Sequence, residues 1–295
     1  MKKFLLLLGI VILIILVLGA LPKKPSEPVS KKFVNEQPVN ILGYTGNAME
    51  PSISRDGQYL FWNSLNDSVD TKLFYAKKID SGTFQFVGEV QGVNGQAPHL
   101  DAVGSIDLNN NFYWVSTRNF PKEIKNYQRG TFVNGTVTGV KPVEGDFYKT
   151  EPGWIIMDAE ISPDGKLLFY VNARFTGGPL PAESNIGVAH NVNGVFKKDQ
   201  NSDALFANIN TKDLEYAPSF SASGLEFFFT REQGGTTYIY LASRSNLNEP
   251  FGKPELLDIT GTVPEAPSIT LDGKTLYYHK REGGVYKIFK MTRAE

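Results

Sequence analysis

The 295-residue sequence contains no cysteine, and this absence excludes several kinds of chemistry. Without cysteine there is no disulfide, no thiolate metal site, no cysteine nucleophile and no lipid-bearing cysteine behind a leader. An excess of one charge is also lacking, since 30 basic and 31 acidic residues leave a formal net charge of −1. A chain without a basic field is not expected to bind nucleic acid.

Sequence motifs specific for catalysis or for metal binding are missing as well. The sequence has no Asp-rich calcium loop, zinc-helix motif, phosphate-cradling Gly-rich loop or serine nucleophile elbow. Its three histidines, His99, His190 and His279, stand at different repeat positions without metal-ligand spacing. We therefore expect no metal and no cofactor.

A long apolar run is present at the start of the chain. Eighteen residues from Phe4 to Leu21 are apolar or Gly, and they follow Lys2 and Lys3. This run is longer than a usual signal core of ~7–15 residues and approaches the ~20 that span a bilayer. Residues 1–21 therefore predict a cleaved signal peptide or a retained membrane anchor, and both place the body outside the cytoplasm. Residues 22–38, with four Pro and four Lys, predict an extended tether.

Four segments of the body align around a two-residue turn followed by an aromatic strand. Glycine supplies the positive φ that a tight hairpin needs. The turn residues at 56, 164, 223 and 272 are 108, 59 and 49 residues apart, so the first gap predicts a further copy near residue 110. It reads SIDLNNNFYWVSTR from Ser105, with Asn in place of Gly. The other four copies are EPSISRDGQYLFWNS from Glu50, DAEISPDGKLLFYVNAR from Asp158, APSFSASGLEFFFTR from Ala217 and APSITLDGKTLYYHKR from Ala266.

Further strand-like segments follow each aromatic strand, as in residues 73–79 and 84–90. Four antiparallel strands per unit of ~50 residues, in five copies without helical periodicity, predict a single all-β domain over residues 39–295. We predict a five-bladed β-propeller of four-stranded blades, acting as a monomer. A β-sandwich or a β-helix fits less well, because groups of four strands recur at one spacing.

The last copy lacks a fourth strand, since the chain ends after VYKIFKMTRAE. The stretch EQPVNILGYTGNAMEPSIS (36–54) parallels GKPELLDITGTVPEAPSIT (252–270), which places Val39–Leu42 at a fourth-strand position. We predict that this N-terminal strand completes the C-terminal blade and closes the ring.

The segments resemble the TolB-type repeat of the WD40-like (PD40-class) β-propellers, in which Pro-Ser-x-Ser-Pro-Asp-Gly precedes an apolar strand. The closest copy is ISPDGKLLFYVNAR (161–174), and IYLASRSNLNEPFGKPELL (239–257) looks like the second half of such repeats in exported bacterial proteins. The copies depart from the pattern at Asn109-Asn110 and at Ser223. The resemblance implies the propeller fold. It implies little about function, because these repeats serve as binding platforms without a shared chemistry.

An acidic residue recurs just before or within the innermost strand of every copy. Carboxylates at the central channel could bind a cation or act on a glycosidic bond. Alternatively, each acid accepts hydrogen bonds from backbone amides at the entrance of its blade. These acids are Glu50, Asp101, Asp158 with Glu160, Glu215 and Glu265.

Aromatic residues and one histidine lie near the same positions. Trp154 and Tyr216 stand beside these acids, and an exposed Trp beside carboxylates is typical of sugar stacking. Most other aromatics alternate along strands and predict packing between blades. His99, in APHLDA, is the histidine nearest the channel. The candidate ligand-binding residues are Glu50, His99, Asp101, Trp154, Asp158, Glu215 and Glu265.

An arginine ends the aromatic strand in four copies. A ring of arginines could receive phosphate or carboxylate groups. Alternatively, each arginine pairs with an acid or a carbonyl of the neighbouring blade. The four residues are Arg118, Arg174, Arg231 and Arg281.

Three functions fit these features. The first is an exported module, tethered to the membrane if the leader is uncleaved, that binds a protein or a glycan without catalysis. The second is a glycoside hydrolase-like enzyme in which Glu50, Asp158 and Glu215 share the roles of base or nucleophile, pKa modulator and general acid, without an assignment of each role to one residue. The third is a scaffold of a cell-envelope assembly.

Overall fold

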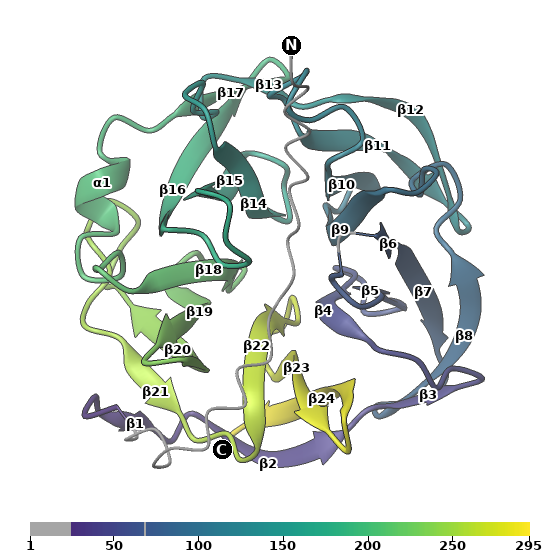
Figure 1. Ribbon diagram of the computed structural model, residues 1–295. Helices are drawn as coiled ribbons and strands as arrows, with labels where there is room; N and C mark the ends of the chain where they lie inside the picture. The colour runs from purple at the N-terminus through teal and green to yellow at the C-terminus, as the bar shows by residue number, and fades with distance from the viewer. Residues whose placement is uncertain (1–24, 68) are drawn as a thin grey trace.

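The structure is a computed structural model that describes residues 25–67 and 69–295, and the strands of these residues form five sheets. Figure 1 shows the sheets arranged in a ring around a common centre. Each sheet follows one copy of the repeat from the centre outward. The chain is therefore an all-β, five-bladed β-propeller, as the repeats predicted.

Each blade is built around four antiparallel strands, which follow one another from the centre outward. The first blade has β4 (Met49–Ile53), β5 (Tyr59–Asn63), β7 (Leu73–Lys78) and β8 (Thr83–Glu89). The second has β9 (His99–Ile106), β10 (Asn111–Ser116), β11 (Tyr127–Val133) and β12 (Thr136–Pro142). The third has β14 (Trp154–Ile161), β15 (Leu167–Arg174), β16 (Glu183–Val192) and β17 (Val195–Lys198). The fourth has β18 (Leu214–Phe220), β19 (Glu226–Gln233), β20 (Thr236–Ser243) and β21 (Glu255–Leu257). The fifth has β22 (Thr262–Ile269), β23 (Thr275–Glu282), β24 (Val285–Arg293) and β2 (Phe33–Pro38).

Short parallel strands add to four of the sheets, and a one-turn helix lies between the third and fourth blades. These elements are β1 (Val29–Ser30) beside β21, β3 (Asn40–Leu42) beside β8, β6 (Asp70–Thr71) beside β9, β13 (Glu144–Gly145) beside β17, and α1 (Ser202–Leu205).

The hairpin between the two inner strands explains the recurrent turn signal. In the first blade the Ser54 hydroxyl donates a hydrogen bond of 2.6 Å to Asp56, and Gly57 has a φ of +70°. In the second blade Asp107 accepts the turn amides instead, and Asn110 adopts a φ of +61°. The turn is therefore held by local bonds that the sequence repeats. The equivalent bonds are Ser162 to Asp164 and Thr270 to Asp272.

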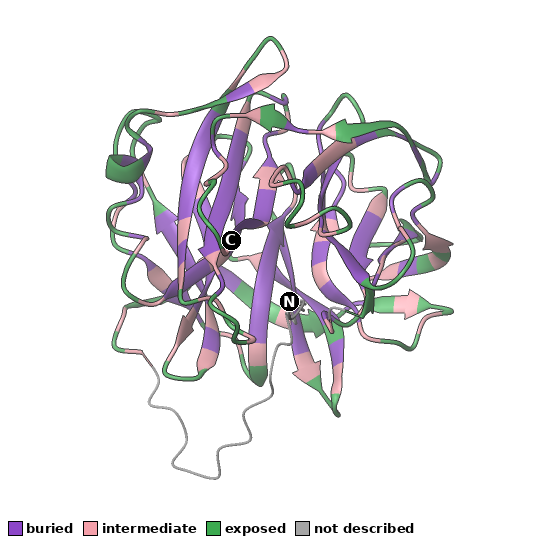
Figure 2. Ribbon diagram, turned by 45° about the horizontal axis from the view of Figure 1, so that its top comes forward, coloured by how far each residue is buried: buried purple, intermediate pink, exposed green. Residues whose placement is uncertain are grey.

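Apolar clusters fill the contacts between neighbouring blades, one cluster for each pair of neighbours. Figure 2 shows that buried residues follow the strands, while exposed residues gather in the loops. The aromatic strands supply the largest side chains of these clusters, so the expectation that they pack between blades is confirmed. The buried aromatic residues of these strands are Phe61, Trp62, Tyr113, Trp114, Phe169, Tyr170, Phe228 and Tyr277.

An N-terminal strand closes the ring, but it is not the expected one. Residues 33–38, as β2, pair antiparallel with β24 and complete the C-terminal blade. The segment Val39–Leu42 follows this strand, and residues 40–42 lie parallel to β8 of the first blade. Part of the stretch expected as a tether, residues 29–38, therefore belongs to the sheets. Residues 33–38 have little strand propensity of their own and form a strand because they pair with the open edge of β24.

The predicted leader, residues 1–21, lies outside the described residues. Within residues 25–67 and 69–295, no helix is long and apolar enough to cross a bilayer.

Phe33 should dominate the stability of the closing strand. It is 2% exposed and meets the Phe228 ring edge-on at a centroid distance of 5.5 Å, whereas Val34 is 37% exposed. Phe33→Ala should lower the free energy of unfolding by about 3–5 kcal/mol, since it empties a core position. The matched variant Val34→Ala on the same strand should lower it by less than about 1 kcal/mol. Equal effects in urea unfolding would contradict this account of closure.

Glu36 should make closure depend on pH. Burial alone would raise its pKa, but hydrogen bonds from Lys280, Tyr278 and Thr260 and the charge of Lys280 bring the pKa below its usual value. A depressed pKa contributes stability above about pH 4.5 that is lost as the pH falls through the folded-state pKa. Glu36→Gln should therefore destabilise by about 1 kcal/mol at neutral pH, after allowance for solvent screening, and converge with the wild type in acid. A constant difference across a series of urea titrations would refute this assignment.

Candidate functional site

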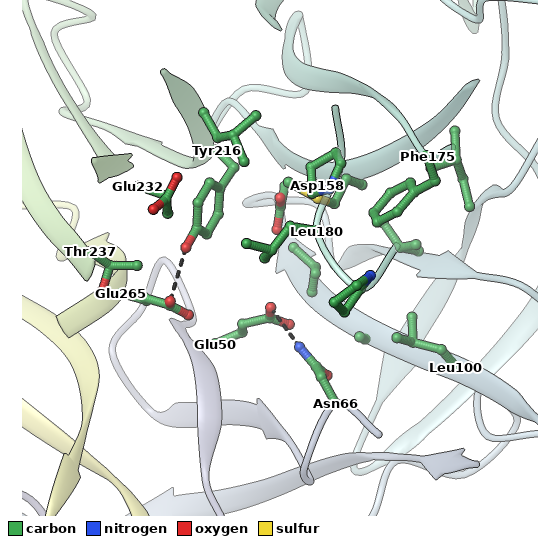
Figure 3. Close-up of a pocket in the computed structure, with 18 of the residues that line it drawn as sticks. Glu50, Asn66, Leu100, Asp158, Phe175, Leu180, Tyr216, Glu232, Thr237 and Glu265 are labelled. Atoms are coloured by element: carbon green, nitrogen blue, oxygen red, sulfur yellow. Dashed lines mark hydrogen bonds between the residues drawn. The ribbon is translucent and has the colours of Figure 1, made fainter. Parts of the chain in front are cut away.

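A cavity of about 180 Å³ lies on the axis of the ring, and all five blades line it. A smaller cavity of about 30 Å³ adjoins it, and Glu50, Val103 and Asp158 line both. The cavity therefore lies where the sequence predicted that acidic residues would converge. Figure 3 shows this site with Glu50, Asp158 and Glu265 around it.

Glu50 and Asp158 occupy the same position of the repeat, seven residues before the turn glycines Gly57 and Gly165. The pairing register of the inner strand shifts here, and Glu50 has a φ of +52°. Such a bulge turns a side chain away from the regular alternation of a strand. The left-handed backbone is strained for residues other than glycine, and strain of this kind gathers at functional sites. The equivalent residues Val103, Ala217 and Ala266 have φ values of +55°, +49° and +55°.

The Glu50 carboxylate is only partly hydrogen-bonded. Its Oε1 accepts a bond of 2.9 Å from Asn66, whose own oxygen accepts one of 2.8 Å from Asn63. Its Oε2 is buried and has no hydrogen-bond partner among the described residues. Burial raises the pKa of Glu50 well above its usual range, and the charges of Asp158 and Glu265 add to this.

Asp158 lies opposite on the third blade and is 2% exposed. Burial raises its pKa to about 7, the Ala217 backbone amide opposes this by donating to the carboxylate, and the charge of Glu265 adds to it. A carboxyl group with this pKa changes its protonation state near neutral pH. Titratable groups perturbed in this way by burial and by neighbouring charge are characteristic of functional sites.

Glu265 of the fifth blade is held by two neighbours. The Tyr216 hydroxyl donates to its Oε1 at 2.9 Å, and His279 Nε2 lies 3.4 Å from its Oε2. His279 Nδ1 accepts a bond of 3.0 Å from the Glu50 amide, so in the neutral ring the proton lies on Nε2, facing Glu265. Burial raises the pKa of Tyr216 well above its usual value, with Glu265 contributing, so the phenol keeps its proton.

Asp101 and Glu215 do not reach the cavity. Each stands nine residues before its turn residue, Asn110 or Gly224, and each is fully buried within its blade. Asp101 accepts from Arg118 at 2.9 Å and from Trp114 at 3.1 Å. Glu215 accepts from Arg231 and from Thr211. Asp101 also accepts from the Gly95 backbone amide at 2.9 Å and Glu215 from the Thr211 amide at 3.0 Å, as the alternative of structural hydrogen bonds expected. Glu215, expected among the catalytic carboxylates, is not among the residues that line the cavities.

Glu160 lies two residues beyond Asp158 and lines the smaller cavity. Arg55 of the first blade reaches across the second blade and donates to Glu160 at 2.7 Å. The same guanidinium donates to the carbonyls of Ile106 and Ile161. Glu160 is thus one half of an ion pair that links three blades.

His99 and Trp154 are also absent from the residues that line the cavities. His99 is 3% exposed, with Nε2 2.9 Å from Asp101 and Nδ1 at the Gln96 carbonyl. Trp154 is the first residue of β14 rather than a residue before the strand, and it is 9% exposed. Lys149 covers its ring at 3.3 Å, so the expected exposed face for a sugar is lacking.

Three of the four arginines pair with an acid of their own blade, and Arg118 and Arg231 also donate to the carbonyls of Val93 and Ile209 in the connections from the preceding blade. Arg118 and Arg231 neutralise Asp101 and Glu215. Arg174 donates to Glu183 at 2.8 Å, and Arg281 donates weakly to the Gly284 carbonyl at 3.4 Å. None of these four arginines pairs with Asp158 or Glu265, and the first blade has no arginine at this position.

The opposite side of the cavity is apolar and was not identified from the sequence. Strands β9, β10 and β14 contribute aliphatic side chains, and the loop after β15 adds Phe175 and the Pro179–Pro181 turn. Residues of this kind are common in strands and loops, so the repeat pattern gives no signal for them. The apolar side includes Leu100, Ile156, Phe175 and Leu180.

No group of three or more histidine or acidic residues in the described part of the chain is arranged to hold a metal ion. The cavity acids therefore stand as separate carboxyl groups around a shared space.

No protein-family model matches the chain, and no curated protein is similar to it in sequence. Among solved structures, a family 117 glycoside hydrolase from the marine bacterium Zobellia galactanivorans has a TM-score of 0.56 at 12% identity, over 88% of this chain and 90% of its own. TolB from Acinetobacter baumannii has a TM-score of 0.46 at 16% identity, and a putative TolB from Agrobacterium tumefaciens one of 0.42 at 16%. These two matches cover 85% and 68% of this chain but only 55% and 64% of the TolB chains. The chain is a five-bladed β-propeller, and TolB is among the solved structures to which it is similar.

Proposed function

We propose that the protein is a binding module that holds a small ligand in its central cavity. The observation that carries this proposal is the convergence of Glu50, Asp158 and Glu265, from three blades, on one cavity with apolar walls. Concave, largely apolar sites with a few convergent polar groups are the usual form of ligand pockets. The left-handed backbone at Glu50 also supports a functional role, because such strain gathers at functional sites.

The size of the cavity limits the ligand. A cavity of ~150 Å³ accepts a benzene molecule, so the volume of about 180 Å³ suits one ring with a short substituent. A single sugar unit of a glycan is one such ligand. The apolar run behind Lys2 and Lys3 supports an extracytoplasmic location for this binding.

Glycoside hydrolysis is the second candidate, with Glu265 in place of Glu215. It is supported by the raised pKa of Glu50 and of Asp158, since one carboxyl must stay protonated as general acid while another is ionised. The similarity to a glycoside hydrolase concerns the fold and adds no argument about chemistry.

Blocking the cavity should abolish binding. We expect saturation-transfer NMR with a panel of methyl glycosides and small primary amines to detect a ligand for the wild type. Thr236→Trp, which puts a large ring into the lining, should remove the signal. Thr131→Trp, at an exposed position of β11, is the matched control and should leave it intact. A signal that survives Thr236→Trp would place the ligand elsewhere.

Asp158→Asn should stabilise the protein in mild alkali. The folded chain holds the Asp158 proton up to about pH 7, whereas the unfolded chain releases it near 3.8. Stability contributed by this group therefore falls as the pH rises between these values. At about pH 8 the variant should melt ~3–8 °C higher than the wild type, and near pH 4 the two should coincide.

Glu160→Gln, two residues away, provides the contrast, because it removes the partner of Arg55. This variant should melt at a lower temperature at both pH values. A wild type that melts at a higher temperature than Asp158→Asn at about pH 8 would contradict the description of Asp158 as a buried carboxyl group with a raised pKa.

The enzyme candidate is tested by turnover of a panel of aryl glycosides. Glu50→Gln and Asp158→Asn should each lower kcat by about 10²-fold or more if their carboxyls take part in proton transfer. Asp203→Asn, whose side chain is 89% exposed, controls for the loss of one charge. Wild-type protein without turnover of any member would remove this candidate.

A further inference from the structure

We propose that the ligand of the central cavity is a small organic cation, an amine whose ammonium group sits among Glu50, Asp158 and Glu265 and whose apolar body lies against the second and third blades. This inference rests on the proposed function, since it names the class of ligand for the same cavity.

The charge of the lining is the first argument. The residues lining the two cavities include Glu50, Asp158, Glu160, Glu232 and Glu265, and no Lys or Arg. Glu160 has Arg55 as a partner, but the acids of the main cavity face one another. Anionic ligands are disfavoured here, because like charges repel strongly where water is scarce. A cation relieves the repulsion by neighbouring carboxylates that adds to the raised pKa of Glu50 and of Asp158.

Hydrogen-bonding capacity is the second argument. Two buried oxygens of the main cavity, Glu50 Oε2 and Thr237 Oγ1, have no hydrogen-bond partner among the described residues. Thr237 is 6% exposed, so its hydroxyl is almost withdrawn from solvent. An ionised carboxylate only accepts hydrogen bonds, and an ammonium group brings three donors and no acceptor. One ammonium can therefore bond several of these oxygens, while a ligand hydroxyl brings one donor.

The two-sided lining is the third argument. Figure 3 shows Glu50, Glu265 and Glu232 on one side of the cavity and Phe175 and Leu100 on the other, with Asp158 between them. A bare metal ion would gain nothing from the apolar side. An amine with a ring or a short alkyl chain uses both sides, because burial of its apolar body adds to the charge interaction.

The affinity of this site should depend on pH through several groups. Asp158 on β14 faces Glu50 from β4, Glu265 from β22, Tyr216 from β18 and Glu232 from β19 around the cavity. His279 on β23 lies behind Glu265. Ionisation of Asp158 above about pH 7 adds negative charge at the centre of this group. An alkyl ammonium keeps its own charge at that pH, since its pKa is about 10, so binding should strengthen as the pH rises.

Calorimetry of the full chain with benzylamine and with benzyl alcohol tests the inference, because these probes share a ring and differ in charge. At about pH 8 benzylamine should bind at least ~10-fold more tightly, and at about pH 5.5 this preference should fall several-fold. Asp158→Asn should abolish the preference, and Asp203→Asn should retain it. Leu180→Ala, on the apolar side, should weaken both probes to the same extent.

Each other outcome overturns the inference. Equal affinity for the two probes would remove the role of the acids, and a preference that persists unchanged in Asp158→Asn would remove Asp158 from the ammonium site as proposed. Calcium ions that bind in the same site and displace benzylamine would assign the acids to a metal. Absence of benzylamine binding while a methyl glycoside still binds would overturn the cationic ligand but keep the proposed function. Absence of all binding would remove both.

Discussion

The pairing of β2 with β24 is the contact on which the rest of the structure depends. A propeller blade buries its two faces only against its neighbours, so each of the five apolar clusters needs two blades in place. Pairing of β2 with β24, the last strand, covers the open edge of the fifth blade and holds Phe33 in the cluster between blades four and five. The carboxyl groups of blades one, three and five can meet around one cavity only because the ring is closed.

Within the ring, small differences between copies decide which acids remain available. An acid nine residues before the turn lies beside the arginine that ends the aromatic strand, and the two form a buried ion pair, as for Asp101 and Glu215. An acid at the bulge, seven residues before the turn, is directed to the channel, as for Glu50 and Asp158. The same repeat therefore produces structural ion pairs in two blades and carboxyl groups that line the cavity in others. Retaining acids that lower stability when ionised is typical of functional sites.

The fold could be predicted because its signals are local: a tight turn ending in glycine and an aromatic strand mark four blades, and the spacing of the copies locates the second blade, where Asn110 replaces the glycine. The closing strand was misplaced, since residues 33–38 contain a proline and become a strand only at the edge of β24. Glu50, Asp158 and Glu265 were among the predicted candidates, and their distance from the turn glycine separates the first two from Asp101 and Glu215. The meaning of this distance becomes clear only when the position of the bulge in the inner strand is known. The hydrogen bond from the Glu50 amide to His279 depends on packing between the first and fifth blades, which an alignment of repeats does not contain.

The position of the closing strand also has a mechanical consequence. The chain enters the ring through β1, which lies along the fourth blade, and continues at once into β2, which completes the fifth. A pulling force applied ahead of residue 25 would load the two-residue contact of β1 first and then the longer pairing of β2. The first contact can yield without opening the ring, while the second must be sheared along its length. Because β1 precedes β2 in the chain, a pull from the N-terminal side can break the β1 contact before it loads the pairing that closes the ring.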